Sequence, residues 1–422
     1  MLALFLVTLF LAPQVWLGPF VGWRVDLVVY PLWLILTIKR GRWMPGGLQH
    51  ADLVFLLFFV WLVVTTVFHG FHEAGPRGQP SSLGHIINYT KYFLLYQFVI
   101  GYAKHPRNVD HIGRWLLFFA GILVVESIQH KLGGTHLGWA GQTLAWADPD
   151  VIAAGGTGRT RWVHIFDGPG VFCVVFTIAL PFALRFLYPW QPHLKRLLGA
   201  ALSIALLIAV YFNGSRGGFL TTLFILSAFT VLRYRASLFA YVVGVGLAVV
   251  LVMAAPSSLT TIRDQSHSTD HRIDMWAEGI EMATQNPILG IGRGNFGVYT
   301  GDLVAHNSAI EIMGEMGFVG LFFWVALIYL CAKGVWQAYV SANDRAMKSL
   351  AVAVGISLAG YVVSSMFVTL EYETFYLLLG LSAATGMATG RRLMLRSKDV
   401  RNVLAIIAVW FVLLKTYVVM YY

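Results

Sequence analysis

The feature that most constrains this chain is a series of thirteen apolar runs, each of a length that can cross a lipid bilayer, ~17–25 residues. They lie near residues 1–19, 21–38, 51–69, 84–103, 111–129, 164–188, 196–212, 217–233, 237–255, 306–332, 348–367, 372–390 and 402–420. Backbone polar groups in lipid must be satisfied within the segment, so runs of this kind predict helices. We therefore expect an all-α polytopic membrane protein of about 12–13 transmembrane helices. The first two runs could instead form a shallow hairpin, because Pro13, Pro19 and Arg24 crowd their junction.

Composition excludes the ordinary soluble class of protein. The 422 residues are 58% hydrophobic and only 12% charged. The net charge of +10 does not point to nucleic acid, because the basic residues form short clusters between the apolar runs, as topology signals do. Two cysteines, Cys173 and Cys331, each lie inside an apolar run and provide no disulfide framework or cysteine metal site.

The basic clusters predict the orientation in the membrane. With the N-terminus in the cytoplasm, every strong cluster falls on the cytoplasmic side. These clusters are Lys39, Arg40 and Arg42; Lys104, Arg107 and Arg114; Arg185, Lys195 and Arg196; Arg233 and Arg235; Lys333, Arg345 and Lys348; and Arg391, Arg392, Arg396, Lys398 and Arg401. The loop 130–163, the turn 213–217 and the long loop 256–305 then share the outer side. We expect one membrane domain over residues 1–422, with 256–305 as its main periplasmic loop containing short amphipathic helices.

The polar loop 256–305 leads into a helix-like run headed by His306 and Asn307. Asn307, Glu311 and Glu315 share one stripe of this run at ~100° per residue. Carboxylates so close to hydrocarbon should face a cavity or partners. A histidine at the end of a span is often only an interfacial hydrogen-bonding residue, so position alone does not make His306 catalytic.

Two arginines outside that run are candidates for binding an anion. Arg216 follows Ser215 in a tight turn between two spans, where its planar fork of donors could meet a phosphate or simply reach lipid headgroups. Arg272 begins an expected amphipathic helix that carries Ile273, Trp276, Ile280 and Met282. Its alternative is a solvated surface charge.

Two further patterns are weaker. Asp148 and Asp150 form a DxD-like triplet that could hold a divalent cation, although a simple turn is the preferred interpretation. The glycines 290, 292 and 294 are not a dinucleotide fingerprint, because no strand and helix frame them, and we expect a flexible turn there.

In combination these motifs resemble the O-antigen ligase and polymerase superfamily of membrane glycosyltransferases. The resemblance covers roughly residues 160–330 and is carried by SRGG at 215–218, by the series Arg272, Trp276, Asn286-Pro287, Gly290 and Gly292, and by HNSAIEIMGEMGFVG at 306–320. One departure is His164, where such proteins commonly carry glycine; it weakens the match of Arg161.

The resemblance implies transfer of a glycan from an undecaprenyl-diphosphate carrier to an acceptor hydroxyl, such as lipid A core or another glycan, on the periplasmic side of a bacterial inner membrane. It implies no cofactor and no metal. His306 would be the base; Arg216, Arg272 and Arg161 would bind the diphosphate; and Asn307, Glu311, Glu315 and Ser215 would support them. Such an enzyme has membrane lipids, and no nucleic acid, as its other partners. The alternative from another class is a lipid-linked oligosaccharide flippase or transporter, in which the arginines bind a diphosphate in transit.

Overall fold

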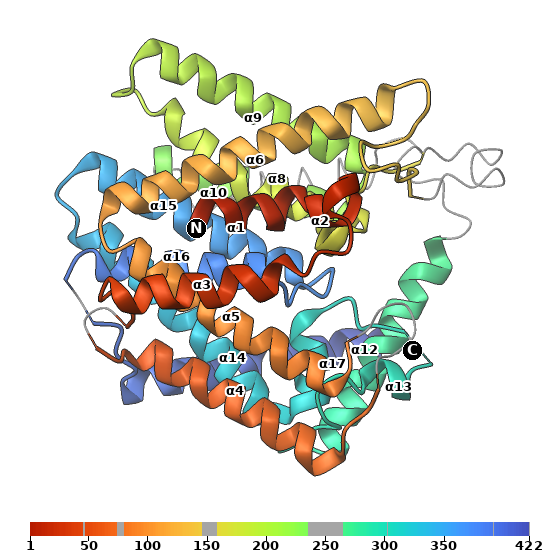
Figure 1. Cartoon of the computed structure of the whole chain (residues 1–422). Coiled ribbons are helices and arrows are strands. Elements are labelled where there is room, and N and C mark those ends of the chain that lie inside the picture. Colours follow the sequence, from red (N-terminus) through yellow and green to blue (C-terminus); the bar gives the residue numbers. More distant parts are fainter. Residues whose placement is uncertain are drawn as a thin grey trace. The chain divides into compact units, whose positions relative to one another are not determined.

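The computed structural model describes residues 1–44, 47–73, 80–145, 158–234, 265–301, 303–390 and 392–421, and no side chains between 265 and 271. Helices account for nearly all of the regular structure in these ranges (Figure 1). Seven helices in this described part are long and apolar enough to cross a membrane. The protein is an all-α polytopic membrane protein, which confirms the predicted fold class. The predicted span 237–255 and the DxD triplet at Asp148 lie outside the described residues.

Contacts divide the chain into two compact units. The first unit contains residues 1–39, 103–265 and 338–364, and the second contains 40–102, 266–337 and 365–422. The helices of the first unit are α1 (Leu2–Leu6), α2 (Pro13–Trp16), α3 (Val25–Lys39), α6 (Pro106–Leu132), α8 (Pro169–Leu184), α9 (His193–Asn213), α10 (Arg216–Tyr234) and α15 (Arg345–Ser365). Those of the second are α4 (His50–His69), α5 (Ser82–Tyr102), α12 (Gln265–Gln285), α13 (Phe296–Tyr299), α14 (Ser308–Ser341), α16 (Glu373–Met387) and α17 (Ser397–Tyr421).

The N-terminal run is broken rather than one continuous helix. A π-helical turn, Val7–Leu11, follows α1, and Ala12 then adopts a left-handed backbone (φ 46°) before Pro13 opens α2. A short 3-10 turn, Gly18–Phe20, precedes α3. Proline cannot continue the preceding helix because it lacks an N–H donor, which explains the break at this junction.

The core of the first unit is α8, whose residues Phe172 to Leu184 are all buried. It packs against α6, α9 and α10. The α9–α10 connection is the tight turn that the sequence predicted, because α9 ends at Asn213, Gly214 is left-handed (φ 64°) and α10 begins at Arg216.

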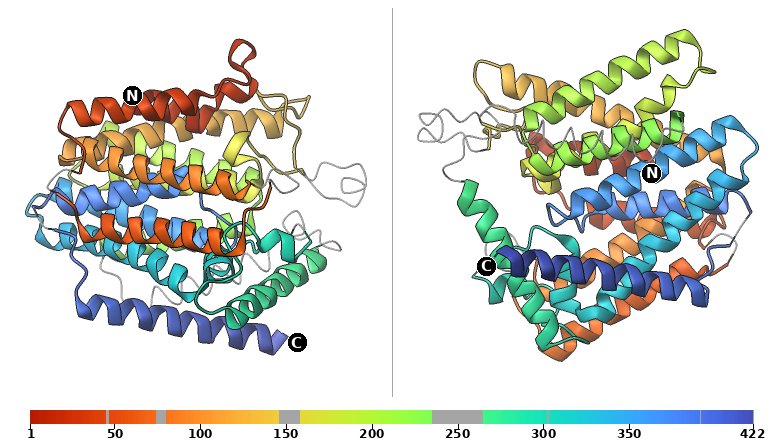
Figure 2. Two further views of the ribbon diagram at one scale, coloured as in Figure 1. Left: turned by 60° about the horizontal axis from the view of Figure 1, so that its bottom comes forward. Right: turned by 180° about the vertical axis from the view of Figure 1, so that it is seen from behind.

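The core of the second unit is α16, which is buried from Thr374 to Gly386 and packs along α5 (Figure 1). A helix that is apolar on all sides belongs in an interior, and α16 fits that rule. The amphipathic α12 lies beside the C-terminal end of α17, where the rings of Trp276 and Tyr417 are 6.1 Å apart (Figure 2). This places α12 at the same end of the unit as the start of α14.

Candidate functional site

The first turn of α14 presents His306 in a strained and fixed position. Asn307 caps the helix, its Oδ1 accepting hydrogen bonds from the amides of Ala309 (3.0 Å) and Ile310 (3.3 Å). His306 itself has a left-handed backbone (φ 49°), which is uncommon for a residue with a side chain. Backbone strain of this kind, ~1–3 kcal/mol, persists where the surroundings hold it, often at functional sites.

Helix α12 brings Arg272 to this turn. The indole of Trp276, one helical turn after Arg272, donates a hydrogen bond to the carbonyl of Ala305 (3.0 Å), the residue directly before His306. Burial and the positive charge of Arg272 together lower the pKa of His306 to about 4. The imidazole is therefore neutral at neutral pH. Among the described residues, no side chain or backbone group hydrogen-bonds to the ring.

Helix α14 is interrupted at Gly317, which has non-helical angles (φ 67°, ψ −174°). A break inside a buried helix leaves amides and carbonyls that need partners. Segment 286–295 supplies them: the amides of Ile291 and Gly292 donate to the carbonyls of Gly314 (3.1 Å) and Glu315 (2.8 Å), and the amide of Phe318 donates to the carbonyl of Pro287 (2.8 Å). Trp61 donates to the remaining carbonyl, that of Met316 (2.9 Å).

This docking corrects the expectation of a flexible turn at the glycine string. A Cβ on Gly317 would lie 2.2 Å from the carbonyl oxygen of Ile288, so only glycine allows the segment to approach. Pro287, Ile291 and Gly292 are hydrogen-bonded to α14 through their backbones, and the segment carries Arg293 into the interior.

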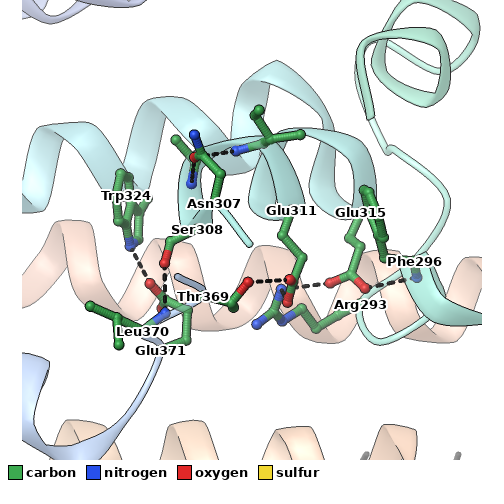
Figure 3. A network of polar contacts seen from close by, with 12 residues as sticks. Arg293, Phe296, Asn307, Ser308, Glu311, Glu315, Trp324, Thr369, Leu370 and Glu371 are labelled. Carbon is green, nitrogen blue, oxygen red and sulfur yellow. Dashed lines mark hydrogen bonds and ion pairs between the residues drawn. The ribbon is translucent and has the colours of Figure 1, made fainter. Parts of the chain in front are cut away.

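Arg293 joins the two glutamates of α14 (Figure 3). Its Nη1 lies 2.5 Å from Oε2 of Glu315 and 3.7 Å from Oε1 of Glu311. The second oxygen of Glu315 accepts the amide of Phe296 (2.9 Å), and Thr369 donates to Glu311 (2.8 Å). Arg293 and Glu315 are each only 3% exposed, so this ion pair is held in the protein interior.

A third carboxylate extends the same network. Glu371 accepts hydrogen bonds from Tyr376 (2.7 Å), Trp324 (2.9 Å) and Tyr89 (3.1 Å), and the guanidinium of Arg293 lies over the Tyr89 ring at 5.7 Å. The neighbouring amide of Leu370 donates to Ser308 at the first position of α14 (2.9 Å; Figure 3). The loop before α16 thus anchors both the start and the middle of the α14 segment that follows His306.

Sequence reasoning missed the roles of Arg293, Thr369 and Glu371. Arg293 lies in the loop 256–305 that was predicted to be external, and its position three residues after Gly290 in a glycine-rich string was a signal for close approach to another backbone. Thr369 and Glu371 left no local signal, since their partners are between 5 and 282 positions away in the sequence.

In the first unit, the SRGG turn packs against the segment that carries Arg161. Asn213 donates to the carbonyl of Thr160 (3.1 Å), and Ser215 caps α10 by accepting the amide of Gly218 (3.2 Å). Arg216, the first residue of α10, is exposed. Arg161 is engaged already: it pairs with Asp167 (3.1 Å) and donates to the carbonyl of Thr143 (2.9 Å).

His164 has a left-handed backbone (φ 62°). Glycine adopts this conformation without strain, so a glycine would be compatible with the backbone at this position.

The predicted site residues thus fall into two local groups. His306, Arg272, Asn307, Glu311 and Glu315 belong to the second unit, and Arg161, Ser215 and Arg216 belong to the first. Within the second unit, Arg272 and His306 are neighbours at the start of α14, while Glu311 and Glu315 pair with Arg293.

The fold is that of a multi-pass membrane protein. Its candidate site holds a neutral histidine next to an arginine at the start of α14. Residues 200–325 match the family model described as O-antigen ligase. This match confirms the resemblance to the O-antigen ligase and polymerase superfamily, and it includes the SRGG turn, Arg272 and the start of α14, but not Arg161. No curated protein matches the sequence.

Proposed function

We propose that this protein is a bacterial inner-membrane glycosyltransferase that moves a glycan from an undecaprenyl-diphosphate carrier to an acceptor hydroxyl on the periplasmic side. The family match supports a ligase-like or polymerase-like membrane enzyme. The observation that carries the finer proposal is the neutral imidazole of His306, free of hydrogen bonds from the described residues and adjacent to Arg272. A base beside a cation is the pair that glycosyl transfer from a diphosphate requires.

The proposed reaction is a single displacement with inversion and without a metal. The acceptor oxygen forms a bond to the anomeric carbon while the bond from that carbon to the diphosphate oxygen breaks. The acceptor proton passes to a ring nitrogen of His306, and undecaprenyl diphosphate leaves with the electron pair. Guanidinium forks of Arg272 and Arg216 stabilise the charge that develops on the diphosphate, as a metal would otherwise do.

The donor would also adjust the base. In the free protein burial, and after it the charge of Arg272, lower the pKa of His306 to about 4. A diphosphate bound to Arg272 offsets that charge, so the pKa of His306 rises toward its ordinary value of ~6.5 and the ring becomes a stronger base. The basicity of His306 would thus depend on whether the donor is bound.

The experiment incubates purified protein with undecaprenyl-diphosphate glycan and candidate acceptors, lipid A core and a free glycan, and measures glycosylated acceptor and released carrier. We expect both products in equal amounts. Wild-type protein that releases neither, but carries the lipid-linked glycan across vesicle membranes, would favour the flippase alternative.

The matched variant is Arg216→Lys. A lysine keeps the charge but offers a point contact in place of a bidentate fork, so we expect most of the turnover to be lost while the protein stays folded. Full activity of Arg216→Lys would contradict the role of Arg216 on the diphosphate and favour contact with lipid headgroups instead.

A further inference from the structure

A strongly basic pocket lies at the end of α14 that is distant from His306. A cavity of about 160 Å³ is lined by Lys333 and Gln337 of α14 and by Arg392, Met394, Arg396 and Lys398 at the approach to α17. Lys333 belongs to a basic cluster predicted to lie on the cytoplasmic side, whereas His306 follows the loop 256–305 that is predicted to lie outside. In that topology the pocket and His306 lie at opposite membrane faces.

The backbone that forms this pocket is fixed. The amide of Leu393 donates to Gln49 (3.3 Å), that of Leu395 to His50 (3.0 Å) and that of Arg396 to Asp399 (2.8 Å). Leu393 is 3% exposed and packs at Gly334, where a Cβ would lie 2.6 Å from it. The basic side chains therefore extend from a backbone that is held by hydrogen bonds and packing.

The charges around the cavity do not cancel. Lys333 pairs with Asp399 (2.6 Å) and also donates to the carbonyl of Met394 (3.1 Å). Arg392, Arg396 and Lys398 are exposed, and none of them has a carboxylate within ion-pair distance among the described residues. Three uncompensated cations thus face one small cavity.

The size and position of the pocket decide the class of ligand. Its volume is below the ~300–1,000 Å³ of pockets that enclose drug-sized molecules, so it has room for one phosphate-sized headgroup. Trp336, which precedes the lining residue Gln337 in the sequence, is 60% exposed, as expected of a tryptophan at the membrane interface. Basic pockets between membrane helices on the cytoplasmic side bind anionic lipid headgroups.

We propose that this pocket binds a phosphate group, presented by an anionic phospholipid headgroup or by free phosphate. The proposal is independent of the glycosyl-transfer function, because the pocket shares no residue with the His306 site. A basic cluster that acts only as a topology signal needs charge in a loop, but neither a cavity nor a fixed backbone.

The test compares two variants that each remove two cations. Arg392→Gln/Arg396→Gln empties the pocket of guanidinium groups, whereas Arg345→Gln/Lys348→Gln removes two exposed charges predicted to lie on the same membrane side but outside the pocket. Native mass spectrometry and thermal unfolding in detergent measure retention of phosphatidylglycerol and the shift of Tm, with phosphatidylcholine and inorganic phosphate as separate additions.

We expect phosphatidylglycerol to bind wild type and the Arg345/Lys348 variant alike, and to bind the pocket variant on the order of 30-fold more weakly, at about fivefold per cation. A stabilising response to inorganic phosphate but not to phosphatidylglycerol, lost in the same pocket variant, would assign the site to free phosphate. Equal losses in the two variants, or no response of wild type to either ligand, would overturn the proposal.

Discussion

Arg272 and Arg293 both belong to the segment before α14, and the protein uses them in opposite ways. Arg293 is 3% exposed and paired with Glu315, whereas Arg272 is half-buried and acts on the neutral ring of His306. Arg293 stabilises the fold through buried ion pairs, whereas Arg272 is the arginine that we propose acts on a ligand beside His306. The carboxylates nearest to His306 in the sequence, Glu311 and Glu315, therefore support the segment that carries His306.

The largest expected effect is on stability, from Arg293→Ala. Removing the guanidinium leaves Glu311 and Glu315 without their counter-charge in the interior, which costs about 3–5 kcal/mol when a buried pair loses one member. Thermal unfolding in detergent measures it. Arg272→Ala is the comparison variant, for which we expect a smaller loss because Arg272 is only half-buried. Equal unfolding temperatures for the two variants would contradict the different roles of Arg293 and Arg272.

The second effect is on chemistry, from His306→Gln. Glutamine keeps a hydrogen-bonding side chain but cannot accept the acceptor proton, so we expect glycosyl transfer to fall by about 10²–10⁴-fold, the range for loss of a general base. Donor binding and unfolding temperature should stay near wild type. The exposed His193 serves as control, since His193→Gln should leave the rate unchanged. Retention of most of the rate by His306→Gln would limit His306 to positioning.

The third effect tests the break in α14. Gly317→Ala places a Cβ against the carbonyl of Ile288 and forces a side chain into a left-handed backbone, at a cost of about 1–3 kcal/mol. Gly121 in α6 has open space around its Cβ position, so Gly121→Ala should instead be neutral or stabilise by up to about 1 kcal/mol. Thermal unfolding measures both changes in stability. Changes of opposite sign would support the docking of segment 286–295 at Gly317, and changes of the same sign would argue that the break carries no strain.

The smallest effect concerns pH. A neutral base loses activity as pH falls through its pKa, which is about 4 for His306 while Arg272 is present. Arg272→Gln removes one of the two causes of that low pKa, so the acid limb of kcat/KM should move to higher pH but remain below ~6.5, because burial persists. Initial rates between pH 3.5 and 8 measure the shift. An unmoved limb would show that Arg272 does not act on His306.

Several elements could be read from the sequence because their signals are local. The apolar runs 51–69, 196–212 and 402–420 correspond to α4, α9 and α17, since burial in lipid requires continuous apolar helices. The turn at 213–217 and the helix around Arg272 were also predictable from glycine, capping and periodicity. The family match over residues 200–325 agrees with the motifs that suggested it.

Tertiary structure alone decided which charged side chains pair with one another. Glu311 and Glu315 lie on the stripe that begins at Asn307, and the family resemblance implied that they support the His306 site. Their partner is Arg293, because amides of segment 286–295 donate to the carbonyls of Gly314 and Glu315 beside the break at Gly317, and that docking carries Arg293 inside. Periodicity determines which face of a helix a side chain occupies; the polar groups that must be satisfied in the interior determine what meets it there.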